Sequence, residues 1–183
     1  MTPDKALQIL KKYTTKPNLI KHALAVSAIM GHFAKLSGED QDYWATVGML
    51  HDIDFECCPE EHCCKCVEIL KAEGFDEKAI LSIQSHGYPT CTQIEPKMYM
   101  EKVLSATDQL SGLIIAVALM RPDKKIASVT LDSVMRKWKD KKFAAGADRE
   151  QILSYCKKMD KSLDYVIEQS LIALQNIASK LDL

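Results

Sequence analysis

Long apolar runs and an excess of either charge are both missing from this sequence. The longest uninterrupted apolar stretch, Leu113–Met120, is much shorter than the roughly 20 residues of a membrane-spanning helix. The 24 basic and 25 acidic residues give a formal net charge of −1, so bulk charge would not hold the chain on a nucleic acid. These shortages argue against a membrane protein and against a nucleic-acid scaffold.

Strand-like patterns are lacking as well. No segment of any length alternates apolar and polar residues as a half-buried strand does. Apolar residues instead recur every three or four positions, and prolines and glycines mark the ends of these stretches, as Pro17 and Gly38 do for residues 17–38. The pattern predicts a single all-α domain, residues 1–183, built from about eight or nine helices.

An export signal is absent, and the cysteines fit that absence. The sequence goes from Met1 directly into a helical pattern, and the seven cysteines are an odd number, so we expect reduced thiols and a cytoplasmic protein. Five cysteines crowd into one short segment, namely Cys57, Cys58, Cys63, Cys64 and Cys66. Only Cys63 and Cys66 have a zinc-knuckle spacing. Burial of this pair in a helix core is therefore favoured over a dedicated thiolate metal site.

The clearest chemical signal is a His-Asp doublet at the end of an apolar run. His51 and Asp52 follow residues 47–50, and two further acids come next, Asp54 and Glu56. Adjacent side chains on a helix do not share a face, so the doublet can converge on one point only where the helix ends. Imidazole and carboxylate are ligands for divalent metals, but two ligands make an incomplete site.

Two more residues are candidates to complete that site. His22 lies on the same helical row as Val26 and Phe33, so it points inward, although a lone inward histidine is more often bonded to a backbone carbonyl. Asp108 lies in the middle of a long helix expected from about Pro96 to Met120. A carboxylate there needs a partner, a metal or a solvent-facing position, and periodicity alone does not decide between these.

The order of these residues resembles the HD superfamily of metal-dependent phosphohydrolases. The resemblance rests on Lys21-His22-Ala23, on Gly48-Met-Leu-His-Asp-Ile-Asp-Phe-Glu56 and on Ser105-Ala-Thr-Asp-Gln-Leu-Ser111. It covers a ligand-bearing core of about residues 17–120, with C-terminal helices in 130–183 completing the fold. Further segments are similar to a prokaryotic branch of that superfamily, namely Lys16-Pro-Asn-Leu-Ile-Lys-His22, Ala116-Val-Ala-Leu-Met-Arg-Pro122 and Lys139-Asp-Lys-Lys-Phe-Ala-Ala-Gly146.

The resemblance implies a metal site and a reaction. His22, His51, Asp52 and Asp108 would hold one divalent ion, such as Mn²⁺, Fe²⁺, Co²⁺, Ni²⁺, Zn²⁺ or Mg²⁺, beside which the phosphoester of a nucleotide or another small phosphorylated metabolite is hydrolysed. A second ion would need His62 or His86. The alternative function is a sensor that binds metal or nucleotide without turnover.

Further roles can be assigned around that ion. Asp52 belongs to the catalytic set, and Asp54 or Glu56 would relay a proton or orient a ligating histidine. His86 at a helix end, together with Lys141 and Arg149 in the basic segment 139–149, would contact phosphate. The alternative for that segment is a solvated charge run.

The oligomeric state stays open at this level. The last helix carries a short heptad-like seam, for which core packing is favoured over a dimer contact. Its positions are Leu163, Ile167, Ser170, Leu174, Ile177 and Leu181.

Overall fold

The computed structural model describes all 183 residues and contains helices and turns but no strand, which confirms the all-α prediction. Ten α-helices and two 3₁₀ turns follow one another along the chain. They are α1 (Pro3–Tyr13), α2 (Pro17–Ser37), α3 (Gln41–Leu50), η1 (Pro59–Glu61), α4 (Cys66–Ala72), α5 (Glu77–Ser85), α6 (Tyr99–Leu119), η2 (Ile126–Ser128), α7 (Leu131–Trp138), α8 (Arg149–Lys158), α9 (Leu163–Asn176) and α10 (Ala178–Leu181).

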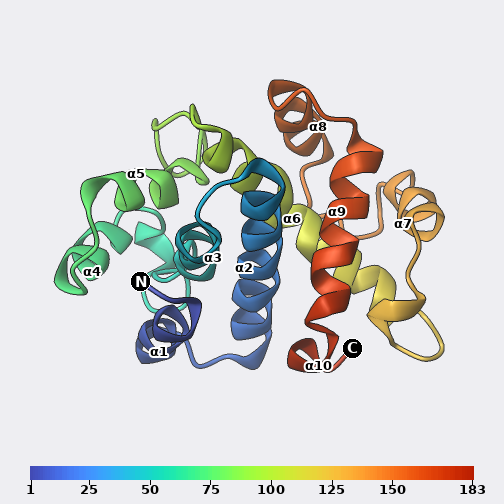
Figure 1. The fold of residues 1–183 in the computed structure, drawn as a ribbon, viewed down its shortest axis with the longest axis horizontal. Helices are drawn as coiled ribbons and strands as arrows, with labels where there is room; N and C mark the ends of the chain where they lie inside the picture. Colours follow the sequence, from blue (N-terminus) through green and yellow to red (C-terminus); the bar gives the residue numbers. More distant parts are fainter.

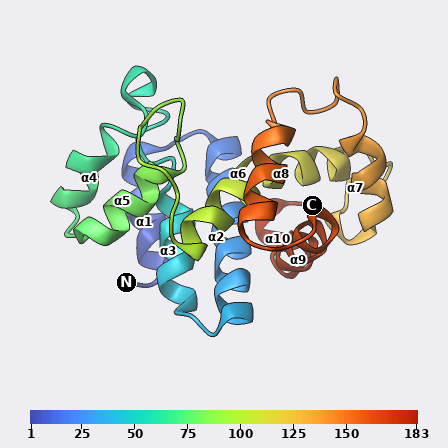
Figure 2. The same cartoon turned by 90° about the horizontal axis from the view of Figure 1, so that it is seen from above.

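The two longest helices, α2 and α6, form the centre of the molecule. In Figure 1, α1 and α3 lie on one side of α2 and α9 lies on the other, while α6 runs obliquely behind α2 and α9. The view from above shows α4 and α5 at one end of the molecule and α7 at the other (Figure 2). Helices α2 and α6 therefore contact most of the other elements, and residues placed on their facing sides meet in the interior.

A single cluster of 42 buried residues forms the hydrophobic core. The inward row predicted for α2 is buried as expected, including Val26, Ile29 and Phe33. Gly38 ends α2 in a left-handed conformation with φ of 70°, as a C-terminal glycine commonly does. The periodicity of this helix thus predicted both its buried face and its end.

Helices α2 and α3 approach each other closely at Gly48. A Cβ atom on Gly48 would lie 2.8 Å from Met30 Cγ and 3.0 Å from the carbonyl oxygen of Val26. Only glycine permits this backbone contact without displacement of α2. Because Gly48 precedes the His-Asp doublet by one turn, the contact sets how far the end of α3 lies from α2.

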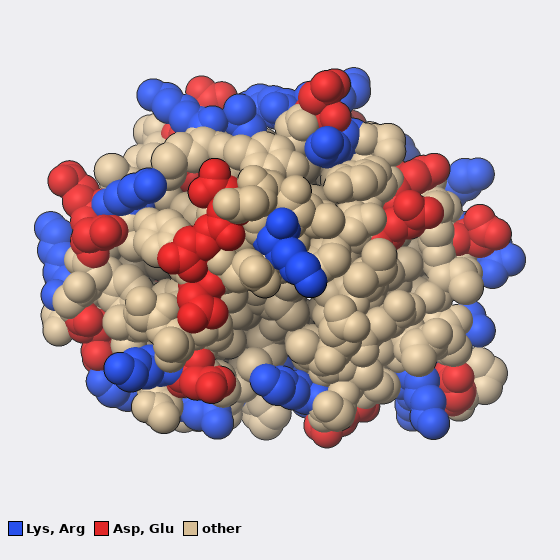
Figure 3. Space-filling model, viewed as in Figure 1, with Lys and Arg blue, Asp and Glu red and all other residues tan.

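Helix α6 has the length and composition of a membrane span but the burial of a core helix. Its most apolar window of 18 residues is 61% buried inside the fold, as in the core helix of a soluble protein. On the face shown in Figure 3, basic and acidic side chains are interspersed, and no field of one sign dominates. On that face the basic and acidic residues are thus mixed in space, as their nearly equal numbers in the sequence suggest.

Two stretches of helix are interrupted in the structure. Pro59 begins only the turn η1, and regular helix starts at Cys66, since Cys63 adopts a left-handed backbone with φ of 65°. The expected last helix is divided into α9 and α10 at Ile177. Helix α6 begins at Tyr99, three residues after Pro96.

Two glycine-to-alanine substitutions should have opposite effects on stability. Gly48→Ala should lower the free energy of unfolding by on the order of 1–3 kcal/mol, because the new methyl group overpacks the α2–α3 contact. At Gly112 a Cβ would meet no atom within 4 Å. Gly112→Ala should therefore raise stability by roughly 1 kcal/mol through helix propensity alone. Urea denaturation of both variants measures this difference, and equal midpoints would contradict it.

Candidate metal centre

Four side chains from three elements converge in the interior. His22 comes from α2, His51 and Asp52 come from the end of α3, and Asp108 comes from the middle of α6. His22 Nε2 lies 3.0 Å from Asp108 Oδ1 and 3.2 Å from His51 Nε2. His51 Nε2 lies 3.3 Å from Asp52 Oδ2 and 3.4 Å from Asp108 Oδ1. The four residues predicted as ligands therefore form one group.

A second group shares Asp52 with the first. The other carboxylate oxygen of Asp52, Oδ1, lies 3.3 Å from His86 Nε2 and 3.5 Å from His62 Nε2. The rings of His62 and His86 are neighbours, with centroids 5.2 Å apart. The sequence offered His62 or His86 as alternatives, whereas the structure brings both to the same carboxylate.

The Nδ1 atoms of the same four histidines are turned away from Asp52 and Asp108. His51 Nδ1 lies 2.8 Å from the carbonyl oxygen of Gly48, and His86 Nδ1 lies 2.5 Å from that of Ile83. Since a carbonyl oxygen only accepts, these contacts assign the Nδ1–H tautomer to both rings.

The other two rings follow the same arrangement. His62 Nδ1 lies 2.8 Å from Asp54 Oδ1, a carboxylate that accepts the N–H. His22 Nδ1 lies 3.4 Å from Ser111 Oγ, whose own proton is donated to the Asp108 carbonyl. All four Nε2 atoms are therefore available as lone-pair donors directed inward, which is how histidines that bind metals are oriented.

The acids change the protonation of the buried imidazole. Burial of the His51 ring disfavours its charged form, but the carboxylates of Asp52 and Asp108 outweigh that effect and hold the pKa of His51 well above its ordinary value. Burial would raise the pKa of the Asp108 carboxyl, yet hydrogen bonds from His22 and His51 lower it. The two carboxylates therefore favour positive charge at the His51 ring.

The spacing of the donor atoms fits divalent ions. Metal–ligand distances of about 2.0–2.2 Å and angles of 90–110° place neighbouring donor atoms roughly 2.8–3.6 Å apart. The separations of Asp52 from the four imidazoles, and those among His22, His51 and Asp108, are 3.0–3.6 Å and fall in that range. Four imidazoles and two carboxylates suit borderline to hard ions. Groupings of these residues could therefore hold a divalent metal ion.

One side of the centre is open. The His51 side chain is fully buried, but those of His22, Asp52 and Asp108 are 24%, 21% and 19% exposed. A small molecule can therefore reach the centre without displacing the core.

Of the two further acids, only Asp54 is part of the centre. Asp54 is fully buried and accepts hydrogen bonds from His62 Nδ1 and from the backbone N–H of Cys66. It therefore orients the His62 ring. Glu56 as a catalytic residue is a correction: its carboxylate accepts from Thr15 and from the Lys16 N–H, and thereby closes the α1–α2 connection.

The basic segment 139–149 also needs a correction. Arg149 was expected to bind phosphate, but its guanidinium donates to five backbone carbonyls and closes the loop before α8. The acceptors are Trp138, Asp140, Phe143, Ala144 and Ala147. Lys141 is an exposed residue on that loop, as the alternative of a solvated run predicts.

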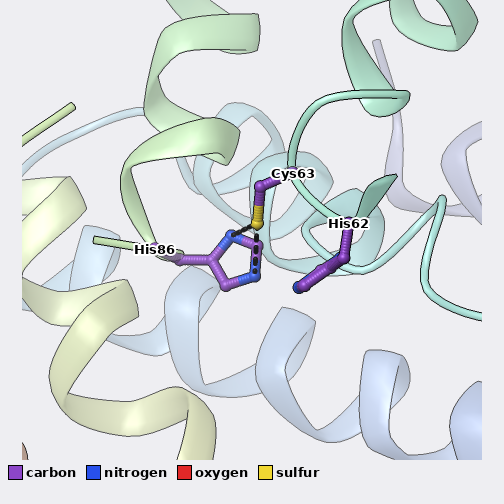
Figure 4. Close-up of side chains that lie close together, drawn as sticks. All are labelled: His62, Cys63 and His86. Atoms are coloured by element: carbon purple, nitrogen blue, oxygen red, sulfur yellow. Dashed lines mark hydrogen bonds between the residues drawn. The ribbon is translucent and has the colours of Figure 1, made fainter. Parts of the chain in front are cut away.

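The thiol of Cys63 is a neighbour that the sequence did not indicate. Its Sγ lies 3.7 Å from His86 Nε2 and 4.0 Å from His86 Nδ1. Figure 4 shows the sulfur against the His86 ring, with the His62 side chain beside them. Gly87 makes room, since a Cβ there would lie 2.5 Å from this sulfur. Cys63 and Cys66 are both buried, but only Cys66 lies in a helix, at the start of α4, so the prediction of a helix core holds for Cys66 alone. Burial raises the pKa of both thiols, that of Cys66 to about 12.

Comparison of the chain with protein-family models, with curated proteins and with solved structures finds no match.

Metal content should depend on Asp52 and not on Glu56. Because Asp52 faces both groups, Asp52→Ala should reduce the bound divalent metal to background after purification with added Mn²⁺. Glu56→Gln is the matched control, since Glu56 contacts only the α1–α2 connection, and it should keep the wild-type metal content. Elemental analysis by plasma mass spectrometry measures both. Loss of metal from the Glu56 variant alone would contradict this assignment.

Proposed function

We propose that this chain is a metal-dependent phosphohydrolase of the HD type, which cleaves a phosphoester of a small phosphorylated molecule. The observation that carries the proposal is the meeting of His22, His51, Asp52 and Asp108 in the order and helical context typical of that superfamily. The open side of the centre supports the proposal, because a substrate phosphate must reach the ions.

The proposed centre holds two ions. Both His62 and His86 face Asp52 Oδ1, which leaves Oδ2 for the first group. When bound, ions of this kind lower the pKa of water and polarise phosphoryl oxygens. The residues of the chain fix the positions of the donors. Asp54 holds the His62 ring, Gly48 and Ile83 hold the His51 and His86 rings, and the core holds the three helices.

Hydrolysis of phosphoesters should require the bound metal and the residues that hold it. The metal-loaded protein should release phosphate from a panel of phosphomonoesters and phosphodiesters, and chelation should abolish the reaction until Mn²⁺, Co²⁺ or Ni²⁺ is restored. Asp108→Asn should lower the rate to that of the metal-free protein, because the first group loses a charged ligand. Arg149→Lys is the control outside the centre. A protein that binds metal in a fixed ratio yet cleaves nothing would instead support the sensor function.

Occupancy of the second group should depend on Asp54. Removing the carboxylate that orients a metal-binding histidine typically weakens metal affinity about 10–100-fold. Asp54→Asn should therefore weaken binding of one of two ions by about that factor and leave the other unchanged, as measured by competition with a metal-sensitive dye. Equal weakening of both ions, or of neither, would contradict the division into two groups.

A further inference from the structure

A cavity of about 490 Å³ lies directly beside the candidate metal centre. Its walls come from the first turns of α2, from the second half of α6 and from residues 181–183 after α9, and His22 is part of its lining. Its volume falls within the roughly 300–1,000 Å³ of small-molecule sites. The cavity therefore adjoins a proposed ligand of the metal and is large enough for an organic group.

Two helical rows lead from the metal centre along this cavity. On α6, Gly112, Ile115 and Leu119 follow Asp108 on the same face, at spacings of four, three and four residues. A rise of 1.5 Å per residue carries this row roughly 16 Å from Asp108. On α2, Asn18 precedes His22 by one turn. Each row begins at a proposed metal ligand, so a phosphate at the centre would direct its ester group between the rows.

Gly112 leaves the α6 side of the cavity without a side chain next to the metal centre. It is exposed and lines the cavity, and a Cβ added there would meet no atom within 4 Å. A longer side chain at this position would extend into open space next to Asp108. The absence of a side chain at Gly112 therefore gives the cavity its depth next to the metal centre.

The lining selects for an uncharged, apolar group. Ile115, Leu119 and Leu181 supply apolar surface. The two charged groups, Lys21 and Asp182, are paired with each other at 2.8 Å across the rim. Since this pair has no net charge, the rim carries no excess of positive charge for a second phosphate. Asn18 remains as a hydrogen-bonding group at the rim.

We propose that this cavity binds the organic group of the substrate, an aromatic or apolar alcohol of up to nucleoside size, and that Gly112 sets the size limit. The proposal rests on the proposed function, since the phosphate held at the metal centre places the organic group between α2 and α6. Gly112 is thus a specificity-determining position in the wall of the substrate site, four residues beyond Asp108.

The test compares Gly112→Leu with Gly112→Ala in the metal-loaded full chain. Both substitutions remove the same backbone glycine, but only leucine fills the cavity. Substrates form a series of increasing size: methyl phosphate, phenyl phosphate, 1-naphthyl phosphate and adenosine 5′-monophosphate. The ratio of kcat/KM for the alanine variant to that for the leucine variant should increase along the series, reaching about tenfold or more for the two largest esters. Equal metal content and urea midpoints verify that both variants are intact.

Binding of adenosine supplies a readout that does not depend on catalysis. The protein is labelled at its isoleucine methyl groups, and the NMR signal of Ile115 is identified by its loss in Ile115→Val. Adenosine should shift this signal in the wild type and in Gly112→Ala. It should not shift the signal in Gly112→Leu. If no ester is cleaved but this pattern holds, the cavity assignment stands and the proposed function fails. If esters are cleaved with a ratio independent of size, the cavity assignment is overturned and the function stands. If neither hydrolysis nor a shift occurs, both fail.

Discussion

The contact of the Asp52 carboxylate with two groups of imidazoles is the interaction on which the centre depends. Each of its oxygens faces nitrogen atoms whose opposite ring positions are already bonded, so the lone pairs point inward. Such a set is stable only with positive charge between its members. The carboxylates of Asp52 and Asp108 accordingly hold the pKa of His51 well above its ordinary value, although burial of the ring works in the opposite direction.

The packing of α2, α3 and α6 brings the side chains of the first group together. Gly48 lets the end of α3 lie against α2, and α6 passes beside α2 so that Asp108 reaches His22. The Gly48 carbonyl also accepts the Nδ1–H of His51. One residue thus permits the helix contact and orients a ligand, so packing and chemistry are coupled at that point.

The regular helices could be predicted from sequence. His22 and Asp108 lie within long periodic helices and the doublet lies at a helix end, but their convergence was expected only from the family resemblance, because periodicity left the direction of Asp108 undecided. The position of His62 was harder, because the turn at η1 and the left-handed Cys63 interrupt the helical pattern that would place it. His86 lies at the end of α5, as expected, but the sequence did not show that it faces the same carboxylate as His62. Glu56 was assigned to chemistry from its position after the doublet, and Arg149 from the charge of its segment and the resemblance of that segment to the prokaryotic branch. Sequence cannot show that backbone groups at 15–16 or 138–147 take up that charge.

The two groups of ligands differ in how the chain holds them, and this difference has a physical consequence. The first group lies on α2, α3 and α6, whose buried faces belong to the main core, so its geometry is fixed by packing. In the second group, His62 lies in the irregular segment between η1 and α4. Asp54 holds that segment in place by accepting hydrogen bonds from His62 Nδ1 and from the Cys66 N–H. Asp54 is fully buried, and each of its two oxygens accepts one of these hydrogen bonds. The orientation of His62 and the start of α4 therefore depend on the same carboxylate. An ion bound by His62 would therefore stabilise the 57–66 segment, whereas an ion in the first group would add charge balance to helices already held by the core.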